Sequence, residues 1–118
     1  MDASRLTLDL RNGHDGRAVV SLEGELDLSG VHRVQDAFAV ASDAYDVVAV
    51  DLAELSFVDL QGIRAFHEAH RTATRRGARI VFVSPGRPVL RILGLVELDG
   101  LELTDDRRML DGSDPILR

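Results

Sequence analysis

Two histidines and a glutamate stand close together at His67, Glu68 and His70, and these residue types can bind a transition metal. A zinc-protease helix carries its histidines four residues apart, which places both on one face with a glutamate between them. Here the spacing is three residues, and the sequence offers no third ligand at a matching distance. The pattern therefore predicts surface histidines on a helix and no metal site.

Residues for covalent catalysis or cofactor binding are missing from the sequence. The chain has no cysteine, and no serine lies in a Gly-x-Ser-x-Gly turn. All 14 basic residues are arginine, which excludes the lysine of a phosphate-binding Gly-x-x-x-x-Gly-Lys loop. No Gly-x-Gly-x-x-Gly run follows a predicted strand. We expect a protein that is not an enzyme and uses no cofactor.

The most informative segment is Ser56-Phe57-Val58-Asp59-Leu60-Gln61-Gly62-Ile63, where a predicted strand ends and a helix begins. Asp59 is placed to cap that helix by accepting hydrogen bonds from the backbone N–H groups of Gln61 and Gly62. Gly62 is costly in a first turn relative to alanine. It is explained either by another surface that must approach the backbone closely or by tight packing of the helix on a strand.

Hydrophobic periodicity predicts the elements that position this segment. An Asn-Gly and Asp-Gly turn separates the first two strands and indicates an antiparallel hairpin. Strand and helix patterns then alternate, which predicts parallel pairing. The expected fold is a small α/β domain with a mixed, mostly parallel sheet and an antiparallel N-terminal hairpin, in the order β-β-α-β-α-β-α-β. The predicted elements are strands at 5–10 and 18–22, a helix at 31–41, a strand at 47–55 that residues 56–59 close, a helix at 61–75, a strand at 79–83, a helix at 88–93 and a strand at 101–103.

Length and charge set the class of protein. A chain of 118 residues fits one domain, which we expect to span residues 1–104, followed by a polar tail at 105–118. A net charge of -6 disfavours nucleic acid as a partner. No apolar run approaches the about 18 residues that a membrane span needs. No secretory signal is visible, so we expect a cytoplasmic protein without membrane insertion.

Positive charge is concentrated in one stretch of this acidic chain. Residues 60–91 hold seven arginines and a single acidic residue, Glu68. The second predicted helix therefore has a basic face. Such a face is either a solvated surface or a docking patch for an acidic protein, because complementary charge speeds encounter.

Several segments, taken together and in this order, resemble the STAS domain family of sulfate transporters and anti-sigma factor antagonists. Gly24-Glu25-Leu26-Asp27 resembles the family's Gly-Glu-Leu-Asp at the end of the second strand. Val48-Ala49-Val50-Asp51-Leu52, followed by Phe57-Val58-Asp59, resembles its central strand and motif loop. Residues 77–80 and 93–95 also match, so the resemblance covers roughly residues 4–103.

This resemblance implies a bacterial regulator of transcription that works by partner switching. Single-domain members resemble anti-sigma factor antagonists, which bind an anti-sigma factor, usually a histidine-kinase-like ATPase. In that scheme the ATPase phosphorylates a serine in an Asp-Ser-Ser-Gly motif, and binding is lost because a phosphate disrupts a packed interface.

The chain departs from the family at the switch itself. Asp59-Leu60-Gln61-Gly62 aligns with Asp-Ser-Ser-Gly, so the phosphorylated serine falls on Gln61, which has no hydroxyl. We therefore expect no phosphorylation-dependent release at this position, and Ser56 is a weak substitute. The residues expected to contact the partner are Asp27, Asp59, Leu60, Gln61, Gly62, Ile63 and Arg64.

Two other functions remain open. The chain could be an accessory subunit of a lipid-transport ABC complex, in which small STAS proteins brace the ATPase, and a missing phosphosite suits that role. It could also sense a nucleotide at the helix N-terminus near Asp59, although the acidity of Asp27 and Asp59 opposes a phosphate. We expect a monomer or a weak dimer.

Overall fold

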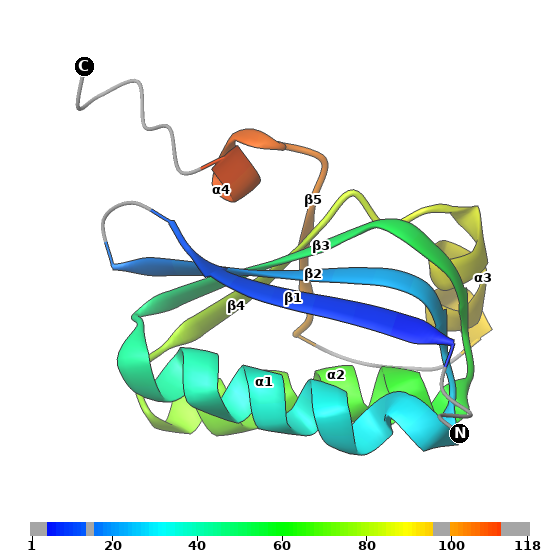
Figure 1. The fold of residues 1–118 in the computed structure, drawn as a ribbon, viewed down its shortest axis with the longest axis horizontal. Helices are drawn as coiled ribbons and strands as arrows, with labels where there is room; N and C mark the ends of the chain where they lie inside the picture. Colours follow the sequence, from blue (N-terminus) through cyan, green and yellow to red (C-terminus); the bar gives the residue numbers. More distant parts are fainter. Residues whose placement is uncertain (1–4, 14–15, 96–99, 112–118) are drawn as a thin grey trace.

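The computed structural model describes residues 5–13, 16–95 and 100–111. A single five-stranded sheet carries α1 and α2 on one face and α4 on the other (Figure 1). In chain order the elements are β1 (Leu6–Asn12), β2 (Arg17–Leu26), the 3-10 helix η1 (Leu28–Gly30), α1 (Val31–Ala44), β3 (Val47–Val58), α2 (Leu60–Arg75), β4 (Arg79–Val83), α3 (Arg87–Leu95), β5 (Glu102–Thr104) and α4 (Arg108–Asp111).

The sheet has the strand order β1-β2-β3-β4-β5. β1 and β2 pair antiparallel, as the turn residues between them predict. β2 with β3, β3 with β4 and β4 with β5 all pair parallel, because a helix lies between the strands of each pair along the chain. The predicted mixed sheet, with its N-terminal hairpin and its alternation of strands and helices, is confirmed.

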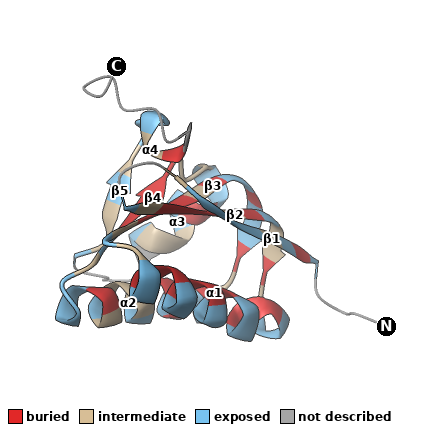
Figure 2. Cartoon of the chain, turned by 60° about the vertical axis from the view of Figure 1, so that its left-hand side comes forward, coloured by how far each residue is buried: buried red, intermediate tan, exposed pale blue. Residues whose placement is uncertain are grey.

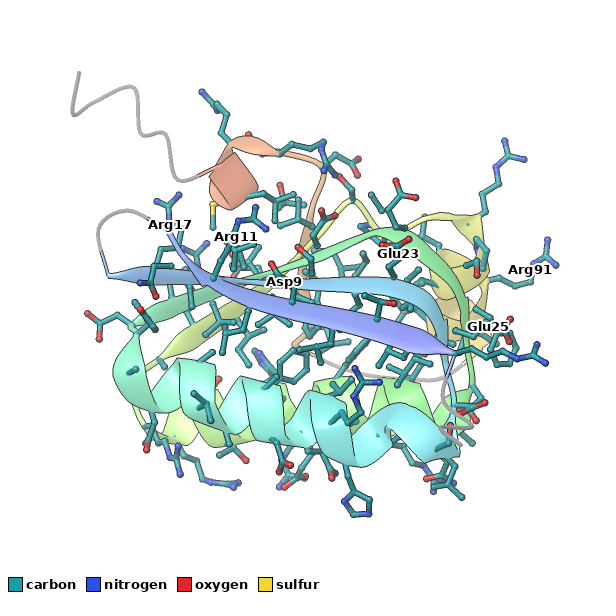
Figure 3. All side chains as sticks on the ribbon, viewed as in Figure 1. Asp9, Arg11, Arg17, Glu23, Glu25 and Arg91 are labelled. Carbon is teal, nitrogen blue, oxygen red and sulfur yellow. The ribbon has the colours of Figure 1, made fainter. Side chains whose placement is uncertain are left out.

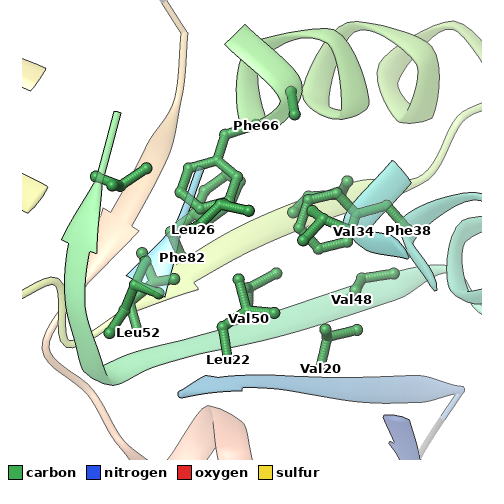
Figure 4. Close-up of a cluster of buried hydrophobic side chains, with 14 of the residues drawn as sticks. Val20, Leu22, Leu26, Val34, Phe38, Val48, Val50, Leu52, Phe66 and Phe82 are labelled. Carbon is green, nitrogen blue, oxygen red and sulfur yellow. The ribbon is translucent and has the colours of Figure 1, made fainter. Parts of the chain in front are cut away.

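The main core lies between the sheet and the helices α1 and α2. Figure 2 shows buried residues along the sides of these helices that face the sheet. The rings of Phe38, Phe66 and Phe82 meet at its centre, and the centroids of Phe66 and Phe82 are 4.9 Å apart (Figure 4). Val20 and Val50 project from neighbouring strands toward the same cluster. Burial on one helix face and one sheet face accounts for the two periodicities in the sequence.

A smaller core covers the opposite face of the sheet. Val19, Ala49, Val81 and Val83 pack there against Leu110 of α4, which is 5% exposed. Arg107, just before α4, donates from Nη2 to the carboxylate of Asp51 at 3.3 Å. The predicted polar tail from residue 105 is therefore wrong for residues 105–111, which fold onto the sheet. Residues 112–118 of that predicted tail lie outside the described part.

Candidate functional site

The carboxyl ends of β2 and β3 lie side by side, and the segments that begin with Asp27 and Asp59 follow them directly. Leu26, the last residue of β2, pairs with Val58, the last residue of β3. The Asp59 backbone N–H then donates to the Leu26 carbonyl at 3.1 Å. Parallel pairing thus brings Asp27 and Asp59 to the same edge of the sheet, although they are far apart in sequence. Ligands and partners often bind at this kind of strand end in α/β folds.

Asp27 holds the start of the 3-10 helix η1. Its Oδ1 accepts hydrogen bonds from the backbone N–H of Ser29 at 2.9 Å and from the Ser29 hydroxyl at 2.6 Å. The bond from the Ser29 side chain, helped by the Ser29 backbone bond, holds the pKa of Asp27 below its usual range. The carboxylate is therefore ionised at neutral pH, and one of its oxygens is already engaged within the chain.

Asp59 caps α2, as predicted, through Gly62, one of the two expected donors. Its backbone is extended, and its Oδ1 accepts from the backbone N–H of Gly62 at 2.9 Å. This bond satisfies one of the N–H groups that a helix start leaves unpaired. A nucleotide phosphate at this helix start would have to compete with the carboxylate of Asp59 for the same donor. The geometry thus gives the nucleotide-sensing hypothesis no support.

Gly62 and Ile63 do not present a surface to a partner. A Cβ added at Gly62 would lie 2.6 Å from Val58 Cγ2 and 2.9 Å from Leu26 Cγ. Tight packing of α2 on the two strand ends, not close approach by another molecule, therefore explains this glycine. Ile63 is 0% exposed in the main core. The prediction that Ile63 contacts the partner is wrong, since its side chain completes the buried stripe of α2.

The outward-facing residues at this end form what we call the strand-end surface. Of the predicted contact residues, Leu60, Gln61 and Arg64 are exposed, and Asp27 and Asp59 are partly buried. Two residues that were not predicted from the sequence are also exposed here, Leu28 at 67% and Phe57 at 45%. The strand-end surface consists of Asp27, Leu28, Phe57, Asp59, Leu60, Gln61 and Arg64.

An irregular β2–β3 pairing shapes the approach to this surface. Gly24 has a φ of +100°, and an added Cβ there would lie 2.2 Å from the Arg5 carbonyl oxygen, so only glycine fits. The pairing register shifts next to it, between Gly24 and Glu25. Across the shift, the hydroxyl of Ser56 donates to the Gly24 carbonyl at 2.9 Å. The Ser56 hydroxyl therefore has a structural partner, which weakens it further as a substitute phosphosite.

The histidine pair on α2 would need further ligands nearby to bind a metal ion. Within residues 5–13, 16–95 and 100–111, no group of three or more histidine, aspartate or glutamate side chains is arranged to hold a metal ion. None of the helices in the described part of the chain is long and apolar enough to cross a membrane.

Comparison with protein families identifies the class. The family model described as "Mlab, STAS domain" matches residues 4–105, which is most of the chain. The chain therefore belongs to the STAS domain family, as its motifs indicated. A search of curated proteins finds no match.

Solved structures place the fold beside anti-sigma factor antagonists. The anti-sigma factor antagonist from Mycobacterium paratuberculosis is 24% identical, with a TM-score of 0.74 over 85% of this chain and 86% of that one. The anti-sigma factor antagonist SpoIIAA in its unphosphorylated form is 19% identical, with a TM-score of 0.74 over 86% and 90%. The murine anion transporter Slc26a9 is 21% identical, with a TM-score of 0.63 over 72% of this chain and 15% of that one.

Proposed function

We propose that this protein is a cytoplasmic anti-sigma factor antagonist that acts by binding, not by catalysis. Its partner is an anti-sigma factor or a regulatory ATPase of the histidine-kinase-like type, which docks on the strand-end surface. The fold it shares with two anti-sigma factor antagonists supports this class.

The observation that carries the proposal is the exposure of large apolar side chains around the start of α2. Leu28, Phe57 and Leu60 are 67%, 45% and 42% exposed, and all three lie within two residues of a strand end. Leucine and phenylalanine gain about 1.5–3 kcal/mol each from full burial. A partner that covers these side chains would recover part of that free energy. Grouped exposed apolar residues are typical of protein-binding surfaces.

Charge at the rim favours an anionic partner surface beside the apolar centre. Arg64 is exposed one turn into α2, and the outer face of the helix continues with exposed Arg71 and Arg75. Rim charges of one sign steer a complementary partner and raise the association rate more than the affinity. The basic face of α2 therefore serves to raise the rate at which the partner associates. The apolar residues supply the affinity of the bound complex.

The same surface lacks the usual switch. The positions of the two family serines hold Leu60 and Gln61, neither of which can accept a phosphoryl group. The nearby hydroxyls of Ser29 and Ser56 are both bonded within the chain, to Asp27 Oδ1 and to the Gly24 carbonyl. Release of the partner by phosphorylation at this surface is therefore not part of the proposal. Control through the amount of protein is the simplest alternative.

A second candidate is an accessory subunit of a lipid-transport ABC complex. Such a subunit would bind its ATPase permanently and would need no phosphate acceptor, which the residues at positions 60 and 61 satisfy. Slc26a9, whose matched portion makes up 15% of its chain, shows that this fold also occurs within a transporter. The two candidates use the same strand-end surface and differ in the partner.

Affinity purification of the tagged protein from its own cells separates the candidates. Wild type and Gln61→Glu are purified in parallel, and the partners are identified by mass spectrometry. A histidine-kinase-like ATPase or anti-sigma factor that is depleted with Gln61→Glu supports the proposal. An ABC ATPase with a permease supports the second candidate. A partner retained equally by both proteins would show that Gln61 lies outside the interface.

A further inference from the structure

The outer strand β1 leaves one edge of the sheet open in the part of the chain that the structure describes. β1 is seven residues long and pairs with β2 alone, whereas β5 at the opposite edge has three residues. An unpaired strand edge presents a row of N–H and C=O groups that can pair with another chain. A long edge strand of this kind is usually either protected from pairing or used to pair with another chain.

Two hydrogen bonds show which backbone groups of β1 face outward. Glu25 N donates to the Arg5 carbonyl at 3.2 Å, and Gly13 N donates to the Arg17 carbonyl at 2.8 Å. Both bonds continue the antiparallel register in which Leu6 lies opposite Gly24. Because hydrogen-bonded and non-hydrogen-bonded pairs alternate, the odd-numbered residues of β1 bond to β2. The even-numbered residues, Leu6, Leu8, Leu10 and Asn12, therefore direct their backbone groups to the open edge.

One of these groups is already occupied. Arg33 of α1 donates from Nη1 to the Leu6 carbonyl at 2.7 Å, which covers the edge at that end. The stretch on which a strand can be added thus runs from Leu8 to Asn12. This stretch lies next to the hairpin turn, at the opposite end of β2 from the strand-end surface. Pairing there would leave the strand-end surface open.

The side chains of this stretch are complementary to themselves. Asp9 and Arg11 project from β1 on the face away from α1 and α2 (Figure 3). Their side chains are 66% and 47% exposed. When two copies of β1 pair antiparallel about Leu10, Asp9 of each copy lies opposite Arg11 of the other, and Leu10 lies opposite Leu10. Opposite charges and apolar pairs across strands are both stabilising.

The neighbouring registers fit less well. Pairing about Leu8 would require the Leu6 edge, where Arg33 is bound. Pairing about Asp9 would also set even-numbered residues against each other, so its backbone groups could bond, but it would place Asp9 opposite Asp9. Like charges directly opposite each other on paired strands are destabilising. The charges thus favour Leu10 over Asp9 as the centre, and the occupied Leu6 carbonyl disfavours Leu8.

We propose that β1 is a homodimerisation edge, in which two copies of this chain join their sheets through antiparallel pairing of residues 8–12 about Leu10. The pairing supplies about six backbone hydrogen bonds. A contact this small is below the size of stable interfaces, so the dimer is weak and reversible. In the single chain Arg11 donates to the Leu110 carbonyl at 3.0 Å and to the Ser21 hydroxyl at 3.2 Å, so its guanidinium turns from α4 and β2 toward the edge when the dimer forms. The proposal is independent of the proposed function.

Engineered cysteines test both the dimer and its register, since the chain has no cysteine of its own. In the proposed pairing the two Leu10 Cα atoms are about 5.5 Å apart, which suits a disulfide. The two Leu8 Cα atoms would be about 13 Å apart, because four residues separate them along the strands. Leu8→Cys is therefore the matched control on the same strand and the same face.

We expect Leu10→Cys to form a disulfide-linked dimer under mild oxidation, and Leu8→Cys to remain largely monomeric. Sedimentation of the wild type at high concentration should show a dimer of the 12.9 kDa chain. Asp9→Arg should weaken that dimer about tenfold, whereas Glu68→Arg, which changes the net charge equally on exposed α2, should not. Preferential cross-linking of Leu8→Cys, or a wild type that stays monomeric at millimolar concentration, would overturn the proposal.

Discussion

Replacing Gly62 with alanine tests whether this glycine serves packing. The added Cβ would lie 2.6 Å from Val58 Cγ2 and 2.9 Å from Leu26 Cγ, whereas non-bonded carbons prefer about 3.5–4.0 Å. All these atoms belong to buried side chains at the ends of β2 and β3. Either the first turn of α2 moves outward by about 1 Å or the two strand residues leave their preferred rotamers.

The expected magnitude comes from two opposing effects. Overpacking of a well-filled site costs about 1–3 kcal/mol, and alanine is better than glycine in a helix by up to about 1 kcal/mol. The net expectation for Gly62→Ala is a loss of about 1–2 kcal/mol in the free energy of unfolding. Urea denaturation followed by circular dichroism measures this directly.

Gly94 provides the matched control. It is the second-last residue of α3, and a Cβ added there would meet none of the described residues within 4 Å. Gly94→Ala should therefore gain up to about 1 kcal/mol from helix propensity alone. A Gly62→Ala protein as stable as the wild type would refute the packing explanation. It would favour the alternative, in which another surface approaches the backbone at Gly62.

Three further outcomes are expected. Leu110→Ala should lower the free energy of unfolding by about 2–3 kcal/mol, measured by urea denaturation, because it removes the buried anchor of α4. The hydrogen bond from Arg79 holds the pKa of Glu102 below its usual value of 4.5. The stability that this pair contributes is therefore present above pH 4.5 and is lost as the pH falls through the lower pKa of the folded state. Glu102→Gln should flatten the acid side of a plot of melting temperature against pH. ATP and GTP at millimolar concentration should not shift the melting temperature, since Asp59 occupies the Gly62 N–H at the start of α2.

The sheet and its two large helices could be predicted because burial is periodic. Val34 and Phe38 repeat at helical spacing on α1, and Val48 and Val50 alternate on β3, and all four are buried as expected. The Asp59 cap was also predictable, since an N-cap is a local arrangement of one side chain and the next turn. These features depend on residues that are close together in the sequence.

The remaining features depend on residues that are distant in sequence. Gly62 had two explanations that only its distances to Leu26 and Val58 could separate. The α4 segment is polar apart from a short anchor, and the partners of Leu110, such as Val19, lie about 90 residues earlier. Large apolar residues are assigned to the core by default. The sequence therefore did not indicate that Leu28 and Phe57 are exposed. An apolar residue next to a polar turn motif is nevertheless a candidate for a surface position.

The most direct test of the proposed interface is the affinity of the recovered partner for two matched variants. Leu60 on the strand-end surface and Leu103 on β5 are 42% and 41% exposed, so a glutamate at either position changes an equally exposed leucine. Glutamate at the first position of α2 also suits the helix dipole, so folding should be preserved.

Isothermal titration of the partner should show binding weakened about tenfold or more by Leu60→Glu, because the charge would be buried in the apolar centre of the interface. Leu103→Glu should bind like the wild type. Equal affinities for all three proteins would contradict the assignment of partner binding to the strand-end surface.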